Sequence, residues 1–471
     1  MNRFFQTRFL ALFLLSGLLL LLSSSGNRDE KVVDKTPKYI FLFIGDGMGF
    51  THVALTEAYL KNLQGKMGFE RLTMTQFPVF GQCETYSKDN QITESAAAGS
   101  AIACGAKANN NEISYFENHS SIAKIARDKG LKVGVISTVS IDHATPATFY
   151  ARNKNRNNYY EIASQLPESN FHFFGGGGFN VAQDQAEYLK QKIQDYGYTI
   201  HYHPDKVSKE DEKVMLISPV ILGGGQMPYS IDRKFYPQAV GLPEIVQSAV
   251  NFLKNENGFF MMVEGGAIDW CSHENDAATI VHEIKDFDDA VRVAYNFYLQ
   301  YPDETLIIVT SDHETGGMSM GVNGSYDTNF AFLKIQKSSI GHFSSLISRY
   351  KRENKTHRLQ DVIDLAQNHF YAESMKFTES EMNSIKRAFD YYFNSKTDLS
   401  KEELSVLYGG YNPVAVAFTR IVNNRAAVGF TSWGHTGTRV PVYSIGNGSE
   451  KFSGAMNNTD INPKIKGIMG W

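Results

Sequence analysis

Acidic, imidazole and hydroxyl side chains gather directly after four apolar, β-rich stretches of this chain. The stretches are 39–45, 132–138, 258–265 and 305–311, and the side chains at or just after their ends are Asp46, His143, Thr145, Glu264, Asp269, His273, Asp312 and His313. In an open α/β sheet the carboxyl ends of parallel strands meet at one edge, and ligands bind there. We therefore expect these groups to converge on one site.

The side chains are of the types that bind metal ions. Carboxylates mixed with imidazoles suit Zn²⁺, which accepts both nitrogen and oxygen donors. An all-oxygen subset such as Asp46, Thr145 and Glu264 suits a harder ion such as Mg²⁺. About eight or nine candidate ligands are too many for one ion. The set therefore favours a two-metal centre, which supports displacement at phosphorus.

Each motif also has an ordinary structural explanation. The turn around Asp46 could be only a turn, in which the carboxylate bonds to nearby backbone. Asp312 and His313 could form a surface pair. Asp269 and His273 are one helical turn apart and could be an exposed ion pair. The coincidence of all these groups at strand ends favours the metal site.

The segment "ITESAAAGSAIACG" at 92–105 places Ser95 after an acidic residue and before small residues. One explanation is a capped helix with Thr93 or Ser95 as its N-cap. The other is a nucleophile at a helix N-terminus, where free N–H groups and the helix dipole attract an anion. Beside a metal site the second is favoured, because small neighbours let the backbone approach a phosphate closely.

The apolar stretches alternate with helix-patterned segments, which predicts an α/β fold. We expect a three-layer sandwich whose central, mainly parallel sheet is covered by helices on both faces. Helix-patterned segments include 120–129 and 277–299, and the second repeats its apolar residues at spacings of three and four. Two glycine runs, "FFGGGGFN" and "ILGGGQMP", lack the spacing of phosphate loops, so we interpret them as strand-to-loop connections.

Residues 329–423 differ in character from the rest of the chain. They are polar, rich in lysine and glutamate, and helix-patterned. We expect a helix-rich insertion of the crown or lid type, carried on a catalytic core formed by 36–328 and 424–471. Its expected role is structural, with dimer contacts or coverage of the site as alternatives.

The N-terminal segment predicts export. Arg3 and Arg8 precede an apolar run at 9–22, and "SSSGN" follows it. This order is typical of a signal peptide, here 1–25. An uncleaved anchor is the alternative, although the run is slightly short for a full span. We expect a periplasmic or secreted protein that contacts the membrane only if this signal remains uncleaved.

The composition is that of a folded globular protein without a disulfide framework. Hydrophobic residues make up 42 % of the 471 residues and charged residues 20 %, which is ample for a large core. The net charge of −4 gives no electrostatic support for nucleic-acid binding. The three cysteines, Cys83, Cys104 and Cys271, are scattered. Export would permit a Cys83–Cys104 disulfide without requiring it.

Six motifs of this chain resemble those of the alkaline phosphatase family and occur in the same order. They are "FIGDGMG", "TESAAAGSA", "HATPATFYARNKNR", "VEGGAIDWCSH", "TSDHETGG" and "WGHTG". They span Asp46 to His435, so the resemblance covers nearly all of the mature chain except 329–423. Together the motifs are highly specific, although "GDGMG" alone is shared with related phosphate and sulfate hydrolases.

The resemblance implies a role for each matching residue. Ser95 would be the nucleophile that becomes phosphorylated. Arg156, thirteen residues after His143, would bind the phosphate, with Arg152 as the alternative. The implied metal ligands are Asp269, His273 and His435 for a first Zn²⁺, Asp46, Asp312 and His313 for a second Zn²⁺, and Asp46, Thr145 and Glu264 for Mg²⁺.

Three residues depart from the best-known pattern of the family. Glu94 stands where aspartate usually precedes the nucleophile, and its longer side chain could position Arg156 less rigidly. His143 and Trp270 stand where the best-known bacterial branch has aspartate and lysine. We expect all three to support the site from outside the ligand set. The last two imply an altered third metal site.

The expected activity is hydrolysis of phosphate monoesters to an alcohol and inorganic phosphate through a phosphoserine, with two Zn²⁺ and one Mg²⁺ per chain. The alternatives are a related phosphodiesterase or sulfatase and a non-catalytic phosphate-binding protein. A diester would need room for a second ester group, which Arg156 would contact. The expected partners are small-molecule phosphate monoesters and a second copy in a homodimer, and no nucleic acid.

Overall fold

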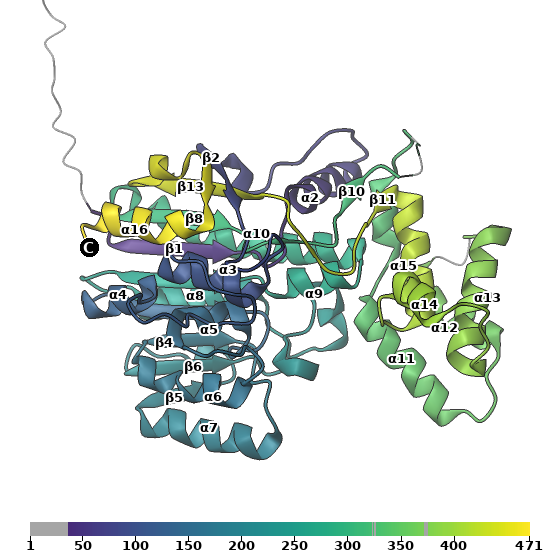
Figure 1. Ribbon diagram of the computed structural model, residues 1–471, viewed down its shortest axis with the longest axis horizontal. Coiled ribbons are helices and arrows are strands. Elements are labelled where there is room, and N and C mark those ends of the chain that lie inside the picture. The colour runs from purple at the N-terminus through teal and green to yellow at the C-terminus, as the bar shows by residue number, and fades with distance from the viewer. Residues whose placement is uncertain (1–35, 323, 325, 372–374) are drawn as a thin grey trace, which may run out of the picture. The chain divides into compact units, whose positions relative to one another are not determined.

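A ten-stranded sheet forms the centre of the computed structural model, which describes residues 36–471 except 323, 325 and 372–374. The predicted signal peptide, 1–25, lies outside the described residues. In sheet order (Figure 1) the strands are β14 (Gly454–Asn457), β2 (Val79–Glu84), β13 (Val440–Gly446), β8 (Thr305–Thr310), β1 (Tyr39–Ile44), β7 (Phe259–Glu264), β3 (Lys132–Ser137), β4 (Phe173–Gly176), β6 (Lys213–Ile217) and β5 (Tyr198–His201). Only β13 runs antiparallel to its neighbours.

The four stretches that the sequence predicts as strands are β1, β3, β7 and β8, and they are adjacent in the order β8-β1-β7-β3. Their last residues are also in register. Ile44 at the end of β1 is paired with Glu264 on one side and Thr310 on the other, and Glu264 is paired with Ser137. The loops that follow these strands therefore begin at the same level of one sheet edge.

Strand β1 shows how the sheet is covered on both faces. Tyr39, Phe41 and Phe43 point into one apolar cluster, and the alternating residues Ile40 and Leu42 belong to another on the opposite face. The first face is covered by α2 (Phe50–Leu63), α8 (Leu242–Leu253) and α10 (Ala277–Tyr298). The second is covered by α3 (Ser95–Cys104), α4 (Ile122–Asp128), α5 (Ala144–Tyr150), α6 (Tyr159–Ser164), α7 (Gln183–Asp195) and α16 (Ile461–Met469). The predicted three-layer α/β sandwich is confirmed.

The predicted helices and connections are found close to their expected positions. The segments 120–129 and 277–299 contain α4 and α10. The first glycine run begins at the end of β4 and continues into a loop, and the second lies in the loop after β6, as expected of connections. The three cysteines are buried and free, so the structure contains no Cys83–Cys104 disulfide.

Two short strand pairs and a group of helices complete the described chain. The pairs are β9 (Glu314–Thr315) with β12 (His435–Thr436), and β10 (Ser319–Met320) with β11 (Val428–Gly429), both antiparallel. The helices are α9 (Ala267–His273), α11 (Ile340–Glu353), α12 (Leu359–Phe370), α13 (Glu379–Asn394), α14 (Lys401–Tyr408) and α15 (Pro413–Ala426). Helices α11 to α15 gather around α15 at the right of Figure 1. Because α15 runs past 423, the boundaries of the insertion at 329–423 stay a prediction.

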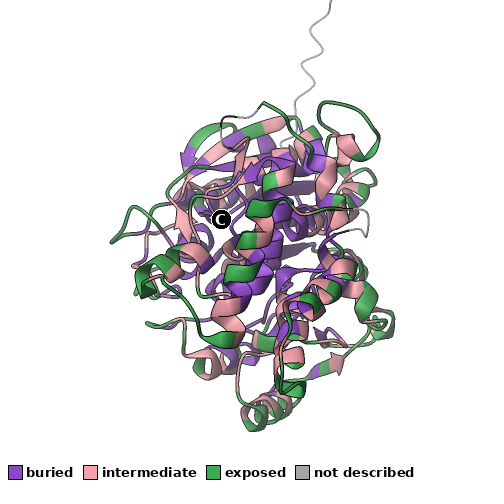
Figure 2. Ribbon diagram, turned by 90° about the vertical axis from the view of Figure 1, so that its right-hand side faces the viewer, coloured by how far each residue is buried: buried purple, intermediate pink, exposed green. Residues whose placement is uncertain are grey.

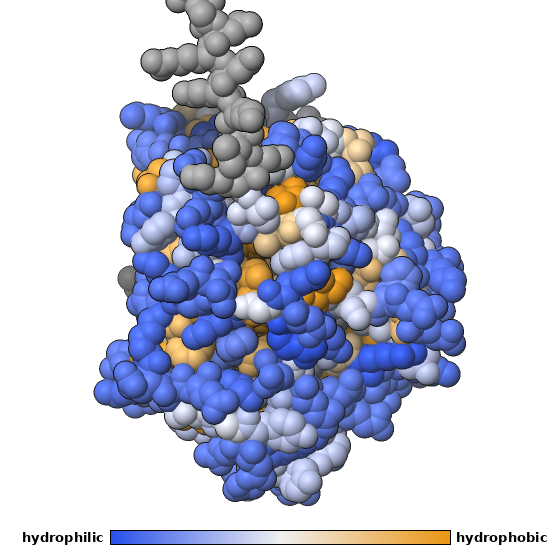
Figure 3. Space-filling view, turned by 90° about the vertical axis from the view of Figure 1, so that its left-hand side faces the viewer, coloured by the Kyte–Doolittle hydropathy of each residue, from blue (hydrophilic) through white to orange (hydrophobic). Residues whose placement is uncertain are grey.

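Buried residues lie along the inner faces of the helices, and exposed residues lie on the outer turns (Figure 2). The face shown in Figure 3 is mainly hydrophilic, with small apolar spots. Among the described residues, no helix combines the length and the apolar character needed to span a bilayer.

Candidate active site

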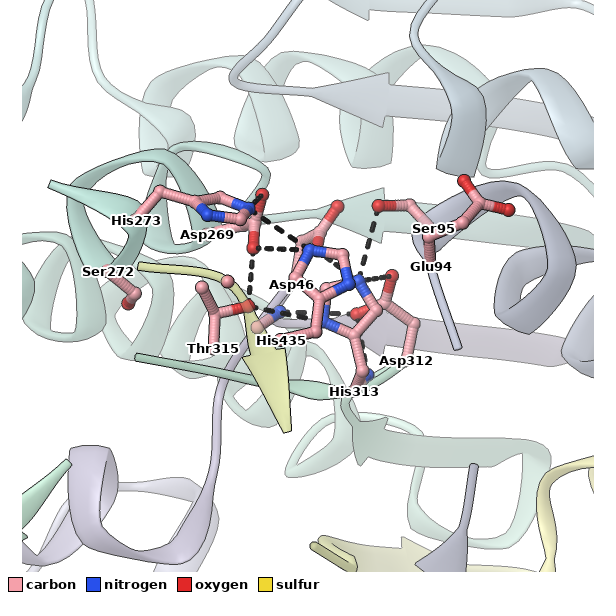
Figure 4. Close-up of polar contacts among 12 residues, drawn as sticks. Asp46, Glu94, Ser95, Asp269, Ser272, His273, Asp312, His313, Thr315 and His435 are labelled. Carbon is pink, nitrogen blue, oxygen red and sulfur yellow. Dashed lines mark hydrogen bonds and ion pairs between the residues drawn. The ribbon is translucent and has the colours of Figure 1, made fainter. Parts of the chain in front are cut away.

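The edge of the sheet at the ends of β8, β1, β7 and β3 carries three groups of potential metal ligands. The groups are Asp269, His273 and His435; Asp46, Asp312 and His313; and Asp46, His143 and Glu264. Within each group the ligand atoms lie within 4.8 Å of one another. Figure 4 shows most of these side chains pointing toward one centre beside Ser95. The structure thus brings together groups that are far apart in the sequence.

In the first group the lone pairs of two imidazoles face each other. His273 Nδ1 lies 2.6 Å from the carbonyl oxygen of Trp433, and His435 Nδ1 lies 2.9 Å from that of Thr93. A carbonyl can only accept, so both Nδ1 atoms carry hydrogen and both Nε2 atoms offer lone pairs. The two Nε2 atoms are 3.1 Å apart and lie 3.4 and 3.5 Å from the carboxylate of Asp269. Two facing Nε2 lone pairs need a cation between them. In the metal-free protein a proton fills this role, because burial would lower the pKa of His273 but the carboxylate of Asp269 raises it to about 9. The mixed nitrogen and oxygen donors also fit a metal ion.

In the second group His313 faces two carboxylates and the candidate nucleophile. Its Nε2 lies 3.4 Å from Asp46 Oδ1, 3.3 Å from Asp312 Oδ2 and 3.2 Å from Ser95 Oγ. The other oxygen of Asp312 accepts backbone N–H bonds from Gly47 and His313. Asp46 Oδ1 is buried without a hydrogen-bond partner. A buried, unpartnered carboxylate oxygen is costly unless a cation binds it, so this group also fits a metal ion.

The third group contains the oxygen ligands that suit a harder ion. Thr145 Oγ1 lies 3.2 Å from Asp46 Oδ2, and Ser137 donates a hydrogen bond to Glu264 Oε2. Glu264 Oε1 is buried and has no partner. His143 accepts a hydrogen bond at Nε2 from Arg156 over 3.0 Å. Its Nδ1 then carries the hydrogen, and this atom is buried without a hydrogen-bond partner beside the ligand set.

Burial and neighbouring carboxylates raise the pKa of three of the four carboxylates in these groups. Burial, together with the nearby carboxylate of Asp269, raises the pKa of Asp312 to about 7. Burial is also the main reason that the pKa of Glu264 rises to about 8 and that the pKa of Asp46 lies well above its usual value. Burial would raise the pKa of Asp269 too, but His273 and the other imidazoles hold it well below its usual range. So much buried negative charge indicates a site built to be neutralised by cations.

We predict that the metal-free protein loses stability as the pH rises from about 6.5 to about 8.5. Asp312, Glu264 and His273 have folded-state pKa values of about 7, about 8 and about 9, each above that of the unfolded chain. Stability from such groups is present at low pH and is lost as the pH rises through the folded-state pKa. The pKa values of His143 and His313 are lowered, so both rings are neutral in the folded state, and above about pH 7 they are mostly neutral in the unfolded chain as well. Thermal unfolding in chelator across this window measures the effect.

The matched control for this experiment is the metal-loaded protein, whose unfolding temperature should change less over the same range. Bound cations replace the protons that the carboxylates otherwise retain. A metal-free unfolding temperature that rises from about pH 6.5 to about pH 8.5 would contradict the prediction.

Ser95 is the first residue of α3 and not its N-cap. Glu94 caps the helix instead, accepting hydrogen bonds from the backbone N–H groups of Ala96 and Ala97 at 3.0 and 2.8 Å. The explanation of this segment as a helix capped by Thr93 or Ser95 is therefore wrong. Because Glu94 takes the capping role, the hydroxyl of Ser95 is free to face His313 at the first turn.

Arg156, and not Arg152, lies at the site. Its guanidinium makes an ion pair with Glu94 and donates to His143, whose pKa falls to about 3 through burial and the neighbouring Arg156 charge. Arg152 instead lies over the ring of Tyr115. Trp270 packs against His143 with ring centroids 5.9 Å apart. Glu94 and His143 therefore contact Arg156 directly, and Trp270 packs against His143.

Sequence reasoning missed Thr315, which joins two of the ligand groups. Its hydroxyl donates to Asp269 Oδ1 at 2.5 Å and lies 3.2 Å from His313 Nδ1. It therefore fixes the ring of His313 and the carboxylate of Asp269 together. The signal that could have revealed it is its place in "SDHETGG", two residues after a ligand and so on the same side of an extended segment.

Comparisons with family models and with curated proteins point to the same family. The alkaline phosphatase family model matches residues 37–175 and 182–470. Alkaline phosphatase 3 of Bacillus subtilis is 31 % identical over 451 residues, covering 93 % of this chain and 88 % of that protein. The repressible alkaline phosphatase of Saccharomyces cerevisiae is 27 % identical, covering 90 % and 79 % of the two chains.

Solved structures agree with the sequence relatives. The cold-active alkaline phosphatase of a psychrophilic Shewanella species has a TM-score of 0.76 at 27 % identity, over 92 % of this chain and 99 % of that chain. A variant of the TAB5 alkaline phosphatase, described with Mg bound in the M3 site, has a TM-score of 0.62 at 27 % identity. The match covers 93 % of this chain and 99 % of that chain.

Proposed function

The chain belongs to the alkaline phosphatase family, and we propose that it hydrolyses phosphate monoesters to an alcohol and inorganic phosphate through a phosphoserine at Ser95. The observation that carries this proposal is the position of Ser95 Oγ, 3.2 Å from His313 Nε2, where the groups of buried carboxylates and imidazoles meet. A hydroxyl becomes a useful nucleophile only where its alkoxide is stabilised. This is the place in the described chain that offers such stabilisation.

The three ligand groups account for two Zn²⁺ and one Mg²⁺ in this proposal. Mixed carboxylate and imidazole groups suit zinc, and the oxygen atoms of Asp46, Glu264 and Thr145 suit magnesium. The proposed ligands are Asp269, His273 and His435; Asp46, Asp312 and His313; and Asp46, Glu264 and Thr145. When bound, these cations would supply the positive charge that stabilises an alkoxide, a leaving oxygen and an ionised water.

The residues of the chain itself bind and orient the substrate. Arg156 presents a planar guanidinium that can donate two parallel hydrogen bonds to non-bridging phosphate oxygens. Glu94 holds that guanidinium beside the first turn of α3, and Asn111 N–H bonds to Glu94 at 2.8 Å and so fixes the carboxylate. Ser95 and His273 lie on opposite sides of the ligand cluster in Figure 4. Attack by Ser95 then sends the leaving alcohol toward His273, as in-line displacement requires.

The cellular setting is part of the same proposal. The apolar run at 9–22 and the basic residues before it support an exported, periplasmic or secreted enzyme. The substrates are small-molecule phosphate monoesters, and the chain would act as a homodimer without binding nucleic acid. The formal net charge of −4 supports the last of these points.

We predict that the zinc- and magnesium-loaded enzyme hydrolyses nitrophenyl phosphate with a kcat/KM at least about 10²-fold above that for the bis-nitrophenyl diester and nitrophenyl sulfate. Arg156 needs two free phosphate oxygens, and a diester replaces one with an ester group. A sulfate ester carries one negative charge less, so it gains less from the cations and from Arg156. Steady-state rates on the three esters, which share one leaving group, measure the ratio.

Arg156→Ala serves as the internal test of this explanation, because its monoester rate should fall while its diester rate changes little. A wild-type preference for the diester or the sulfate would overturn the proposed activity. Phosphate binding without turnover of any ester would favour the non-catalytic alternative.

A further inference from the structure

A cavity of about 440 Å³ lies beside the proposed active site. His273 lies in its wall, so the cavity shares this residue with the first ligand group. Its other walls come from the second glycine run, from α9 and from residues near α11 and α15. Small-molecule sites are typically about 300–1,000 Å³, so this volume suits part of a substrate.

The position of the cavity makes it the place for the alcohol part of the substrate. His273 lies on the side of the ligand cluster opposite Ser95 (Figure 4). An in-line attack by Ser95 directs the leaving oxygen to that side. The part of the monoester beyond the scissile bond therefore extends toward the wall that His273 shares. This step rests on the proposed phosphatase activity.

Aromatic rings form much of the cavity wall. Tyr229, Tyr236, Trp270 and Tyr411 all line it. Gly224 packs directly over Trp270: its φ is +73°, and a Cβ there would lie 3.1 Å from the indole ring. The second glycine run therefore packs against the ring of Trp270, where a side chain would be crowded. Ring faces of this kind bind the C–H faces of sugars as well as cations.

The polar groups of the cavity decide between these two kinds of ligand. Gln226 is 6 % exposed, and its Nε2 has no hydrogen-bond partner. Glu274 accepts one long hydrogen bond, 3.4 Å, from the hydroxyl of Tyr229. An ammonium group could donate a hydrogen bond to Glu274. Because an ammonium group has no acceptor atom, it would leave the N–H of Gln226 without a partner. A hydroxyl can both donate and accept, so neighbouring hydroxyls would satisfy both residues.

We propose that this cavity binds the polyhydroxylated alcohol part of a sugar-type phosphate monoester, and that Gln226 determines this specificity by donating to a substrate hydroxyl. Neither lysine nor arginine is among the described residues that line the cavity. A second phosphate or another anionic group on the substrate would therefore meet no lysine or arginine there to neutralise its charge. Ser339, His342 and Tyr411 of the predicted insertion, 329–423, line the same cavity. The proposal therefore gives the insertion a role in substrate binding.

The test compares matched primary phosphate esters with the zinc- and magnesium-loaded full-length enzyme. Glucose 6-phosphate and n-hexyl phosphate have the same carbon number and differ in their hydroxyl groups, and phosphocholine supplies an ammonium. We expect kcat/KM for glucose 6-phosphate to exceed that for hexyl phosphate by about tenfold or more. Gln226→Leu should lower this ratio about tenfold, the size expected when one buried hydrogen bond of about 1.4 kcal/mol is lost.

Two further variants separate recognition from folding. Gln226→Glu has nearly the same shape but presents only acceptors when it is ionised, so it should lose the preference for the sugar ester as Gln226→Leu does. Gln82→Leu, on β2 and outside the cavity, should leave kcat/KM unchanged for both the sugar ester and the hexyl ester. Equal kcat/KM values for the sugar and hexyl esters in the wild type would overturn the inference. So would a preference for phosphocholine, or a ratio unchanged by Gln226→Leu.

A binding measurement distinguishes failure of this inference from failure of the proposed function. Calorimetry on metal-loaded Ser95→Ala should give about tenfold tighter binding of glucose 6-phosphate than of hexyl phosphate. If the wild type hydrolyses none of these esters while that preference is present, the phosphatase proposal fails and the sugar-binding cavity stands. If the esters are hydrolysed but bind equally, the cavity inference alone fails.

Discussion

Replacement of Ser95 by alanine is expected to lower kcat for nitrophenyl phosphate by roughly 10³-fold or more while the metal content stays near that of the wild type. The hydroxyl is the group placed to attack phosphorus, and alanine leaves no atom to receive the phosphoryl group. The ligands of the three groups are all other side chains, so the variant keeps them. Steady-state kinetics together with elemental analysis of the purified variant measure both quantities.

Rapid quench in acid gives a more direct readout of the same prediction. The wild type should accumulate a phosphorylated chain under conditions where dephosphorylation is slow, and Ser95→Ala should not. Ser100→Ala is the matched control, because Ser100 lies on the same helix and bonds to the backbone of Glu112. It should keep kcat within about twofold. Full activity of Ser95→Ala would show that Ser95 is not the nucleophile.

Removal of metal ions by a strong chelator is expected to lower activity by roughly 10³-fold or more, since several kcal/mol of charge stabilisation in the transition state are lost. Without cations the pKa values of Asp312 and Glu264 are about 7 and about 8, so protons compete for the ligand atoms. Dialysis, assay and metal analysis before and after the treatment measure the change. Adding Zn²⁺ and Mg²⁺ together should restore the activity.

Separate additions of the two metals test how they are distributed. Mg²⁺ alone should restore little activity, because two of the three groups contain imidazoles that favour zinc. Zn²⁺ alone should restore part of it. An enzyme that is fully active after complete removal of metal would contradict the two-metal mechanism. A restored protein with a single ion per chain would contradict the stoichiometry.

The strand-end rule accounts for most of the site that could be predicted from the sequence. Asp46, Glu264 and Asp312 lie at or after the ends of adjacent parallel strands that are in register, which is the reason they meet. The spacing of apolar residues predicts the helix across 277–299, and continuous apolar, β-rich runs predict strands β1 and β8. Chain segments with strong local patterns and short connections are the ones whose positions follow from sequence.

Contacts made over long distances in the chain could not be predicted in this way. His435 reaches the site because β12 pairs with β9, and strands of two residues carry no periodic signal. Glu94 became the N-cap because its side chain turns back to the helix, although glutamate is not a favoured capping residue. The unpaired amide of Gln226 depends on packing between distant loops, which no local pattern records.

The pairing of β12 with β9 fixes when the site can be completed during synthesis. Thr315 and His435 are paired directly, yet the second of them leaves the ribosome 120 residues after the first. Until then the nascent chain holds the nucleophile and seven of the eight proposed ligands but lacks one imidazole of the first group. If the first group binds a metal ion as proposed, stabilisation by that ion would reach its full extent only after His435 has joined the site.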